Sequence, residues 1–418
     1  MHIAIIESKL DGKGGSQRQA LSLALELKKM GHAVKVYALA CNKEACFPDM
    51  LNQLEIVCLP SVNRSLHKKP MKIFGPFNYM FYAREESRRA RELAFHIDRN
   101  TDILNPHDRL GFRTAYYFKR LVKDIPAVLM MSDILTKGWM AWRRQQLNPA
   151  LVPSLRKKLF NRIVDAYEVR KFIMPHEGIV TLDNRTKAWV DDYFGKKAVV
   201  VRSGLDIEKF PFVFHRAPSY QVKILMAGIF FIHRRYEDAI RAVKMLVDKH
   251  YDVYLSVAGI YARNSEYADY YRKLCDLVGE LNLNDRVKFL GNISDEELLS
   301  QYHHNDIYVS PNHLQSWGLA VFEAMACGMP VIVSKTAGAS EVLTDGKTGL
   351  LVNPKSPQEI ANAIERLCGD FDLYATLSSS GREFVEKNIS WKQYAQGMTR
   401  VFEDIMNQRK ENTNSLLP

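Results

Sequence analysis

The stretch Pro311–Pro354, PNHLQSWGLAVFEAMACGMPVIVSKTAGASEVLTDGKTGLLVNP, decides the fold of this chain of 418 residues. It places a turn, a short apolar helix, a strand and a second glycine turn close together. This order is typical of the ligand-binding edge of an α/β sheet, where strands end and helices begin. Gln315 lies in the predicted loop and Glu323 inside the predicted helix Leu319–Cys327, eight residues further on.

Alternating strand and helix patterns extend on both sides of this stretch. Predicted strands are Ile3–Ile6, Ala33–Leu39, Ile103–Asn105, Ala127–Met131, Gly178–Leu182, Ala198–Val201, Val222–Ala227, Val253–Ala258, Val287–Leu290, Ile307–Ser310 and Pro330–Val333. Helical patterns lie between most of them, the first at Gln19–Met30, and the polar, proline-containing residues 206–220 interrupt the alternation. We therefore predict an α/β fold with two Rossmann-like, doubly wound domains, residues 1–206 and 207–385.

The composition is that of an ordinary globular protein, with 47% hydrophobic and 25% charged residues. Glu7 interrupts the first apolar run, which argues against a signal peptide, and no run of 18 apolar residues predicts a transmembrane helix. The six cysteines are scattered, without metal-ligand spacing. These features indicate a reducing compartment and a cytoplasmic location.

The net charge of +11 is unevenly distributed. Residues 143–171 hold eight cations against two acids, and residues 64–82 mix cations and aromatic side chains with no acid. Such segments can attract nucleic acid, an anionic membrane surface or a phosphorylated acceptor. The alternative is a solvated basic face beside an ordinary core.

Two glycine turns precede predicted helices. Gly14 and Gly15 could admit a phosphate or sugar to a helix N-terminus, but Gln17 replaces the third glycine of a dinucleotide motif, which argues against NAD. A tight turn without a ligand is the alternative. After Gly228, Arg234 and Arg235 lie between a strand and a helix, where paired arginines could hold a diphosphate.

Residues 311–354 resemble the donor site of the retaining glycosyltransferases of family 4, which have the GT-B fold, two Rossmann-like domains facing each other across a cleft. The matching residues are Pro311, Gly318, Leu319, Glu323, Ala324, Ala326, Gly328, Pro330, Val331, Gly338, Glu341, Val342, Asp345, Gly346, Thr348, Gly349 and Pro354. Residues 201–206 and 286–291 also match. Two sites depart from the family pattern: Gln315 replaces a glutamate, and Ile229 replaces an arginine.

The resemblance implies roles for individual residues. Glu323 is expected to hold the ribose of a sugar nucleotide, and the backbone at Gly318 and Leu319 to face its diphosphate. The backbone near Asn292 and Ile293 is expected to face the base. The full expected donor site is Gly14, Gly15, Gly228, Arg234, Arg235, Asn292, Ile293, Gln315, Gly318, Leu319 and Glu323.

Two residues are expected to act near the reacting sugar. Gln315 would contact sugar hydroxyls as an amide, which donates and accepts but carries no negative charge. His107, in the segment Asn105–Asp108, resembles the family's histidine at a strand end. A lone histidine can also be structural or solvated, so both readings of His107 stay open.

The resemblance implies metal-independent, retaining transfer of a sugar from a UDP-, GDP- or ADP-sugar. The expected acceptor is a saccharide or lipid-linked acceptor in envelope polysaccharide, lipopolysaccharide or glycolipid synthesis. No cofactor and no nucleic-acid partner are expected. Residues 64–82 and 143–171 suggest an anionic membrane surface at the inner face of the membrane. Residues 386–418 are expected to form helices that cross back to the N-terminal domain. The alternatives are a synthase or phosphorylase making a soluble glycoside, and a non-catalytic relative that binds a nucleotide sugar.

Overall fold

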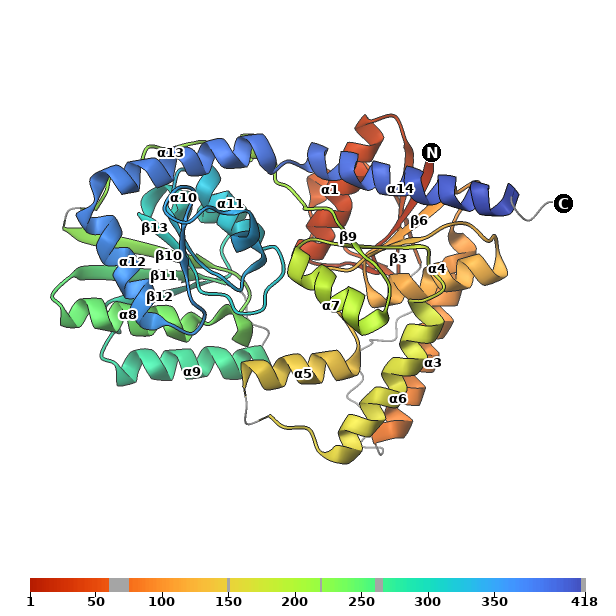
Figure 1. Cartoon of the computed structure of the whole chain (residues 1–418), viewed down its shortest axis with the longest axis horizontal. Coiled ribbons are helices and arrows are strands. Elements are labelled where there is room, and N and C mark those ends of the chain that lie inside the picture. Colours follow the sequence, from red (N-terminus) through yellow and green to blue (C-terminus); the bar gives the residue numbers. More distant parts are fainter. Residues whose placement is uncertain (60–74, 149–150, 219, 260–265, 415–418) are drawn as a thin grey trace. The chain divides into compact units, whose positions relative to one another are not determined.

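A computed structural model describes residues 1–59, 75–148, 151–218, 220–259 and 266–414. The chain forms two compact units (Figure 1). The first contains Met1–Arg202 together with Trp391–Pro418, and the second contains Ser203–Ser390. The units divide a few residues from the predicted boundaries at 206 and 385. The second unit includes both the segment that enters it, residues 203–206, and the segment that leaves it, residues 386–390. The isolated bridge between Leu205 and Ser390 joins these two segments.

The first unit is built on parallel strands ordered β5-β3-β1-β6 and β7-β8-β9. A bridge between Leu104 and Ala127 connects β6 with the segment that leads into β7. Its elements are β1 (His2–Ile6), β2 (Lys9–Leu10), α1 (Gly15–Lys29), β3 (Ala33–Ala38), β4 (Ala40–Cys41), α2 (Pro48–Leu51), β5 (Glu55–Cys58), α3 (Gly75–His96), β6 (Ile103–Pro106), α4 (Arg109–Leu121), β7 (Val128–Met130), α5 (Lys137–Leu147), α6 (Leu155–Phe172), β8 (Gly178–Thr181), α7 (Asn184–Phe194), β9 (Val199–Val200) and α14 (Trp391–Asn414).

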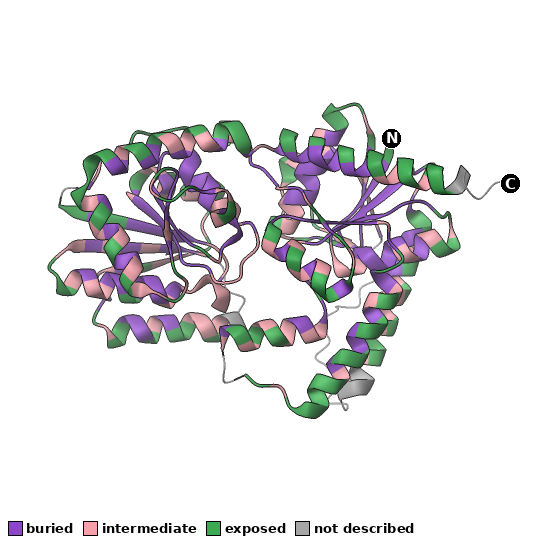
Figure 2. Ribbon diagram, viewed as in Figure 1, coloured by how far each residue is buried: buried purple, intermediate pink, exposed green. Residues whose placement is uncertain are grey.

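The central strands of the first unit are buried on both faces, as expected for parallel strands covered by helices. Four consecutive residues of β1, Ile3 to Ile6, are at most 2% exposed. Figure 2 shows buried strands enclosed by helices whose outer faces are exposed. Because β1 and β6 pair in parallel, their carboxyl ends lie at the same edge of the sheet.

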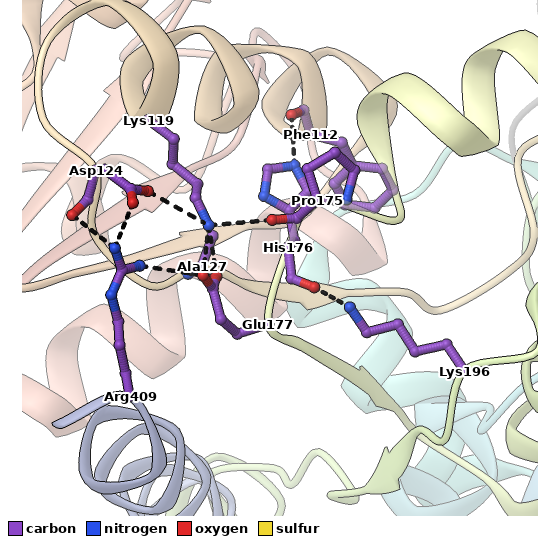
Figure 3. Close-up of polar contacts among 9 residues, drawn as sticks. All are labelled: Phe112, Lys119, Asp124, Ala127, Pro175, His176, Glu177, Lys196 and Arg409. Carbon is purple, nitrogen blue, oxygen red and sulfur yellow. Dashed lines mark hydrogen bonds and ion pairs between the residues drawn. The ribbon is translucent and has the colours of Figure 1, made fainter. Parts of the chain in front are cut away.

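The last helix, α14, belongs to the first unit. The Tyr394 hydroxyl on α14 is buried and accepts a hydrogen bond from Gln19 Nε2 on α1 at 2.7 Å. Near the other end of α14, Arg409 donates to Asp124 at 2.5 Å and to Glu177 at 3.1 Å (Figure 3). Lys119 reaches the same Glu177 carboxylate at 2.5 Å. These contacts dock α14 at both of its ends.

The second unit contains one six-stranded parallel sheet, ordered β12-β11-β10-β13-β14-β15. Its elements are η1 (Ile207–Lys209), β10 (Gln221–Ala227), η2 (Ile232–Arg234), α8 (Tyr236–Asp248), β11 (Asp252–Ala258), α9 (Glu266–Glu280), β12 (Val287–Gly291), α10 (Asp295–His304), β13 (Ile307–Ser310), α11 (Leu319–Ala326), β14 (Val331–Ser334), η3 (Gly338–Val342), β15 (Leu350–Val352), α12 (Pro357–Gly369) and α13 (Phe371–Asn388). Within the described ranges, no helix has the length and apolarity that crossing a bilayer requires.

The order of strands reverses between β10 and β13. From β10 the chain builds outward through β11 and β12, and then returns to add β13, β14 and β15 on the other side. In parallel α/β sheets, ligands bind outside the carboxyl ends of the strands at such a switch point. Two loops follow these strands, residues 228–235 after β10 and residues 311–318 after β13, and they make up the central part of the candidate site.

Candidate functional site

The loop after β10 brings Arg234 back over the end of its own strand. Gly228 has φ +146°, and a Cβ built on it would lie 2.9 Å from the Arg234 Cζ. Glycine therefore allows the guanidinium to lie against the backbone at the switch point. The Nε of Arg234 is buried without a hydrogen-bond partner, and no carboxylate among the described residues pairs with this side chain.

Arg235 is placed differently, although it is the next residue. Its guanidinium donates two hydrogen bonds to Asp238, at 2.9 and 2.7 Å, and its Nη1 lies 2.7 Å from Glu237. Asp238 is only 2% exposed, so Arg235 neutralises a buried carboxylate at the start of α8. The structure thus separates the two predicted arginines into one engaged in an internal ion pair and one without such a pair.

The loop after β13 is held by contacts with the loop after β14. The Gln315 carbonyl accepts a hydrogen bond from the Gly338 N–H at 2.9 Å, and the Gln315 side-chain oxygen accepts one from the Asn312 amide. A Cβ on Gly338 would lie 2.4 Å from the backbone nitrogen of Trp317, so only glycine permits this approach. The Trp317 indole is buried and donates to the Ser203 carbonyl at 2.8 Å.

Gly318 ends this loop in a left-handed conformation, with φ +98°, and is the N-cap of α11. No side chain caps the helix at that position, and the first helical residue is Leu319. Free N–H groups at a helix N-terminus attract anions such as phosphate. The Gln315 side chain lies next to Gly318, since a Cβ built on Gly318 would be 3.6 Å from Gln315 Oε1.

Glu323 lies in the second turn of α11 and is 5% exposed. The buried Tyr302 hydroxyl donates to its Oε2 at 3.0 Å. Burial, together with the nearby Glu323 carboxylate, raises the pKa of Tyr302 well above its ordinary value, so Tyr302 is a neutral donor.

The remaining donor-side prediction concerns Asn292 and Ile293. They directly follow β12, at the carboxyl edge of the same sheet, and Asn292 is exposed. The Gly259 N–H after β11 donates to the Gly291 carbonyl at 2.9 Å. The ends of β11 and β12 are therefore connected beside the switch point.

A backbone contact also joins the two central loops, because the His313 N–H donates to the His233 carbonyl at 2.8 Å. All the predicted residues of the second unit are thus brought to one edge of its sheet. The second unit holds Gly228, Arg234, Arg235, Asn292, Ile293, Gln315, Gly318, Leu319 and Glu323. Gly14, Gly15 and His107 lie in the first unit.

In the first unit, Gly14 is the extended N-cap of α1 and Gly15 is the first helical residue. The predicted helix began at Gln19, whereas α1 begins at Gly15, because its polar first turn lacks the apolar periodicity of the later turns. The Ser16 hydroxyl donates to Glu7 at 2.6 Å. The N-terminus of α1 therefore lies beside the carboxyl end of β1.

His107 follows β6 and is 6% exposed. Its Nε2 lies 2.8 Å from Asn105 Oδ1, and its Nδ1 is buried without a partner among the described residues. Burial lowers the pKa of His107 to about 3, so the imidazole is neutral near pH 7. A neutral ring bonded to an amide is compatible with a structural role as well as with a catalytic one.

Two carboxyl groups that were not predicted as site residues lie at the same edge. Burial and the nearby Asp108 raise the pKa of Glu7 to about 8. Asp108 caps α4 by accepting from the Gly111 N–H at 2.6 Å, and it also accepts from the Ser8 hydroxyl. The sequence signal for both was available, since Glu7 directly follows β1 and Asp108 comes two residues after the end of β6, and these two strands pair in parallel.

Within the described ranges, no cluster of three or more His, Cys, Asp and Glu side chains is arranged to bind a metal ion. The edge of the second unit presents one unpaired guanidinium, a helix N-terminus, an amide and a buried carboxylate.

Residues 208–384 match the model of the family described as glycosyl transferases group 1. The D-inositol 3-phosphate glycosyltransferase of Corynebacterium jeikeium is 31% identical over 166 residues, which cover 40% of this chain and 39% of that enzyme. The chain covers less than half the length of this relative, and 45% of the length of a second curated relative, an uncharacterized glycosyltransferase of Methanocaldococcus jannaschii.

Solved structures with the same fold cover almost the whole chain. Sucrose-phosphate synthase from Thermosynechococcus elongatus has a TM-score of 0.73 and 20% identity, over 98% of this chain and 100% of that one. Anabaena HepE, solved in complex with UDP, has a TM-score of 0.70 and 17% identity, over 97% and 100%. The chain therefore has the predicted GT-B fold of two Rossmann-like units. Residues 208–384, less than half of the chain, are similar to the glycosyl transferases group 1.

Proposed function

We propose that this protein is a glycosyltransferase whose second unit binds a nucleotide-diphosphate sugar at the β10/β13 switch point. The observation that carries the proposal is the position of Arg234. Its guanidinium lies over Gly228 with no carboxylate partner among the described residues, at the sheet edge that also holds the uncapped N-terminus of α11. An unpaired arginine and free backbone N–H groups at one edge match the chemistry of a diphosphate.

The other predicted residues complete the proposed site. Glu323 would accept hydrogen bonds from the ribose hydroxyls beside the one it accepts from Tyr302. The backbone at Asn292 and Ile293 would face the base. Gln315 is held near Gly318 by Asn312 and would bond sugar hydroxyls through its amide. The backbone at Gly14 and Gly15, in the first unit, is also predicted to contact the donor.

The proposed reaction retains the anomeric configuration and needs no metal ion. In it, the C–O bond between the anomeric carbon and the diphosphate breaks, a bond between the anomeric carbon and the acceptor oxygen forms, and the proton of the acceptor hydroxyl passes to the leaving diphosphate. Arg234 and the start of α11 would stabilise the negative charge that develops on the leaving diphosphate. Gln315 brings no negative charge to the sugar, so positioning rather than ionic stabilisation is the contribution assigned to it.

HepE was solved with UDP, so a UDP-sugar is the first donor to test, followed by GDP- and ADP-sugars. We propose a saccharide or lipid-linked acceptor, as used in envelope polysaccharide or glycolipid synthesis. His107 is proposed as a further catalytic residue because its buried Nδ1 has no described partner.

The test compares two adjacent arginines. Arg234→Gln is expected to raise the Kd for the preferred donor about 10- to 100-fold, because a charge-assisted hydrogen bond contributes roughly 1.5–3 kcal/mol. Arg235→Gln is the matched control. It is expected to leave the Kd nearly unchanged but to lower Tm, because Asp238 is left buried without its partner.

Donor affinity is measured by calorimetry and turnover by nucleotide release. Equal affinity in the wild type and Arg234→Gln would contradict the assigned diphosphate site. Binding of a donor without release of nucleotide under any acceptor condition, in both the wild type and Gln315→Glu, would favour the alternative of a non-catalytic nucleotide-sugar binder.

A further inference from the structure

The outer face of α6 (Leu155–Phe172) carries an apolar stripe that faces solvent. The stripe consists of Leu155, Leu159, Ile163 and Tyr167, spaced four residues apart, with exposures of 83%, 61%, 63% and 50%. Residues at this spacing lie on one side of a helix. Single exposed apolar residues are ordinary, but four in one row form a continuous patch that marks an interaction surface.

The opposite face of α6 is fixed to the first unit, so the stripe cannot turn inward. Glu168 pairs with the buried Arg113. Asp165 accepts hydrogen bonds from the backbone N–H groups of Lys137 and Gly138 at 2.8 and 2.7 Å, and from the Tyr193 hydroxyl at 2.7 Å. The helix is therefore anchored by its two acidic residues.

This anchoring leaves no acid among the exposed residues of α6. Asp165 and Glu168 are the only acids of the helix, and both are buried. Five cations are exposed on the same helix: Arg156, Lys157, Lys158, Arg162 and Arg170. No ion pair with a described residue engages them. Cations thus border the apolar stripe, and no acid on α6 opposes them.

The neighbouring helix α3 extends the same kind of surface. Met80 and Phe81 are 65% and 71% exposed near its start. The Tyr79 ring packs edge-on against Phe160 of α6 at 5.9 Å, so the two helices lie side by side at this point (Figure 1). Figure 2 shows the exposed outer face of α6 beside α3. Of the predicted basic-aromatic segment, residues 64–74 lie outside the described residues.

We propose that the stripe on α6, with Met80 and Phe81 of α3, docks this protein on an anionic lipid bilayer. Leucine, isoleucine and aromatic side chains on one helix face enter the boundary between headgroups and acyl chains, while flanking lysines and arginines contact lipid phosphates. The positive charge of this face favours an anionic bilayer over a second copy of the chain. Two copies of this face brought together would oppose five unpaired cations with five more, which disfavours a symmetric dimer.

The full-length chain is tested by sedimentation with vesicles of phosphatidylcholine alone and of phosphatidylcholine with 30% phosphatidylglycerol. Binding is expected to the anionic vesicles only, and to weaken as salt increases. Replacing Arg156, Arg162 and Arg170 by Ser is expected to lower the partition coefficient about 100-fold, since each cation near the surface contributes about fivefold. The matched control replaces three exposed cations of the second unit, Arg216, Lys273 and Lys347, by Ser.

A second pair of variants separates insertion from charge. Leu159→Ser with Ile163→Ser is expected to lower binding at least tenfold with the net charge unchanged, because two exposed apolar side chains no longer enter the bilayer. Phe371→Ser, at a 58% exposed position of the second unit, is the control and should bind like the wild type. Unchanged Tm in all variants shows that they are folded.

Three results would overturn the proposal. These are absence of binding to both kinds of vesicle, equal loss in the α6 and control variants, or a wild-type dimer in solution that the double variant Leu159→Ser, Ile163→Ser converts to a monomer. Vesicle binding requires no sugar transfer, so failure here is distinguishable from failure of the proposed glycosyltransferase activity.

Discussion

At the scale of single residues, burial decides the chemistry more than residue type does. Arg234 and Arg235 are adjacent and identical, yet only Arg235 is committed to a buried carboxylate. Glu7 and Glu323 are both buried glutamates. Glu323 accepts a hydrogen bond from a neutral tyrosine, whereas Glu7 lies beside a second carboxyl group, Asp108, that disfavours its ionised form.

The raised pKa of Glu7 predicts a pH dependence of stability. The folded state holds this proton up to about pH 8, and the unfolded state releases it near its ordinary pKa. The free energy of unfolding therefore falls as the pH rises through this interval. Glu7→Gln, which keeps an acceptor for Ser16, is expected to be more stable than the wild type above pH 8, by roughly 1–3 kcal/mol.

Urea unfolding between pH 4 and pH 9 checks this prediction. The difference between Glu7→Gln and the wild type should grow across the interval and be small at its acidic end. Glu44→Gln, at an exposed position, is the control. Parallel pH curves for the wild type and Glu7→Gln would show that this carboxyl is not held in its neutral form.

A second residue-scale prediction concerns the close approach at Gly338. Gly338→Ala would place a Cβ 2.4 Å from the Trp317 nitrogen, so the loop after β13 must shift. We expect a loss of roughly 1–3 kcal/mol in stability and weaker donor binding. Thermal unfolding with and without the donor measures both. Gly279→Ala in α9, with no atom within 4 Å of the new Cβ, should instead be neutral or slightly stabilising.

At the scale of elements, two helices determine what the first unit presents to its surroundings. α6 buries its acids and exposes its cations, which turns an ordinary basic segment into a one-sided surface. α14 completes the core of the first unit from the far end of the chain, through buried aromatic side chains such as Tyr394 and Phe402.

The buried hydroxyl of Tyr394 provides the test of how α14 is docked. Tyr394→Phe removes the hydroxyl that accepts from Gln19 Nε2. The buried Gln19 amide then loses this hydrogen bond. We expect a loss of roughly 1–2 kcal/mol in the stability of the first unit, seen by calorimetry. Tyr220→Phe, at an 84% exposed position, should cause no change. A neutral Tyr394→Phe would mean that apolar packing alone docks the helix.

At the scale of the whole molecule, each unit has its own sheet and core, and the chain passes between the units twice. The consequence is that a single C-terminal deletion should act on the unit that begins at the N-terminus. A chain ending at Ser390 lacks all of α14 and would expose the buried surface of α1.

We expect this truncated chain to lose hydrogen-exchange protection in β1, β3 and β6 while β10, β11 and β13 keep theirs. The reason is that α14 contributes buried side chains to the first unit only, including Tyr394, Met398 and Phe402. Exchange measured by mass spectrometry on the full and truncated chains gives the comparison. Loss of protection in the second unit as well would show that the two units fold as one.

The sequence by itself determined the alternation of strands and helices, because apolar periodicity and glycine turns are local properties. It therefore located most strands, the α/β class and the edge at residues 311–354. It did not predict short elements such as β5 and β15, whose three or four residues carry too little pattern. It also started α1 four residues late, because the first helical turn is polar.

Only the tertiary structure decided which charged groups have partners. The pairing of Arg235 with Asp238, the burial of Glu7 against Asp108 and the inward orientation of both α6 acids all depend on where segments meet in space. Charge and hydrogen-bond energies change steeply with distance and burial, and neither can be read from spacing along the chain. The sequence thus identified the residue types at the donor edge, and the fold separated Arg234 from Arg235.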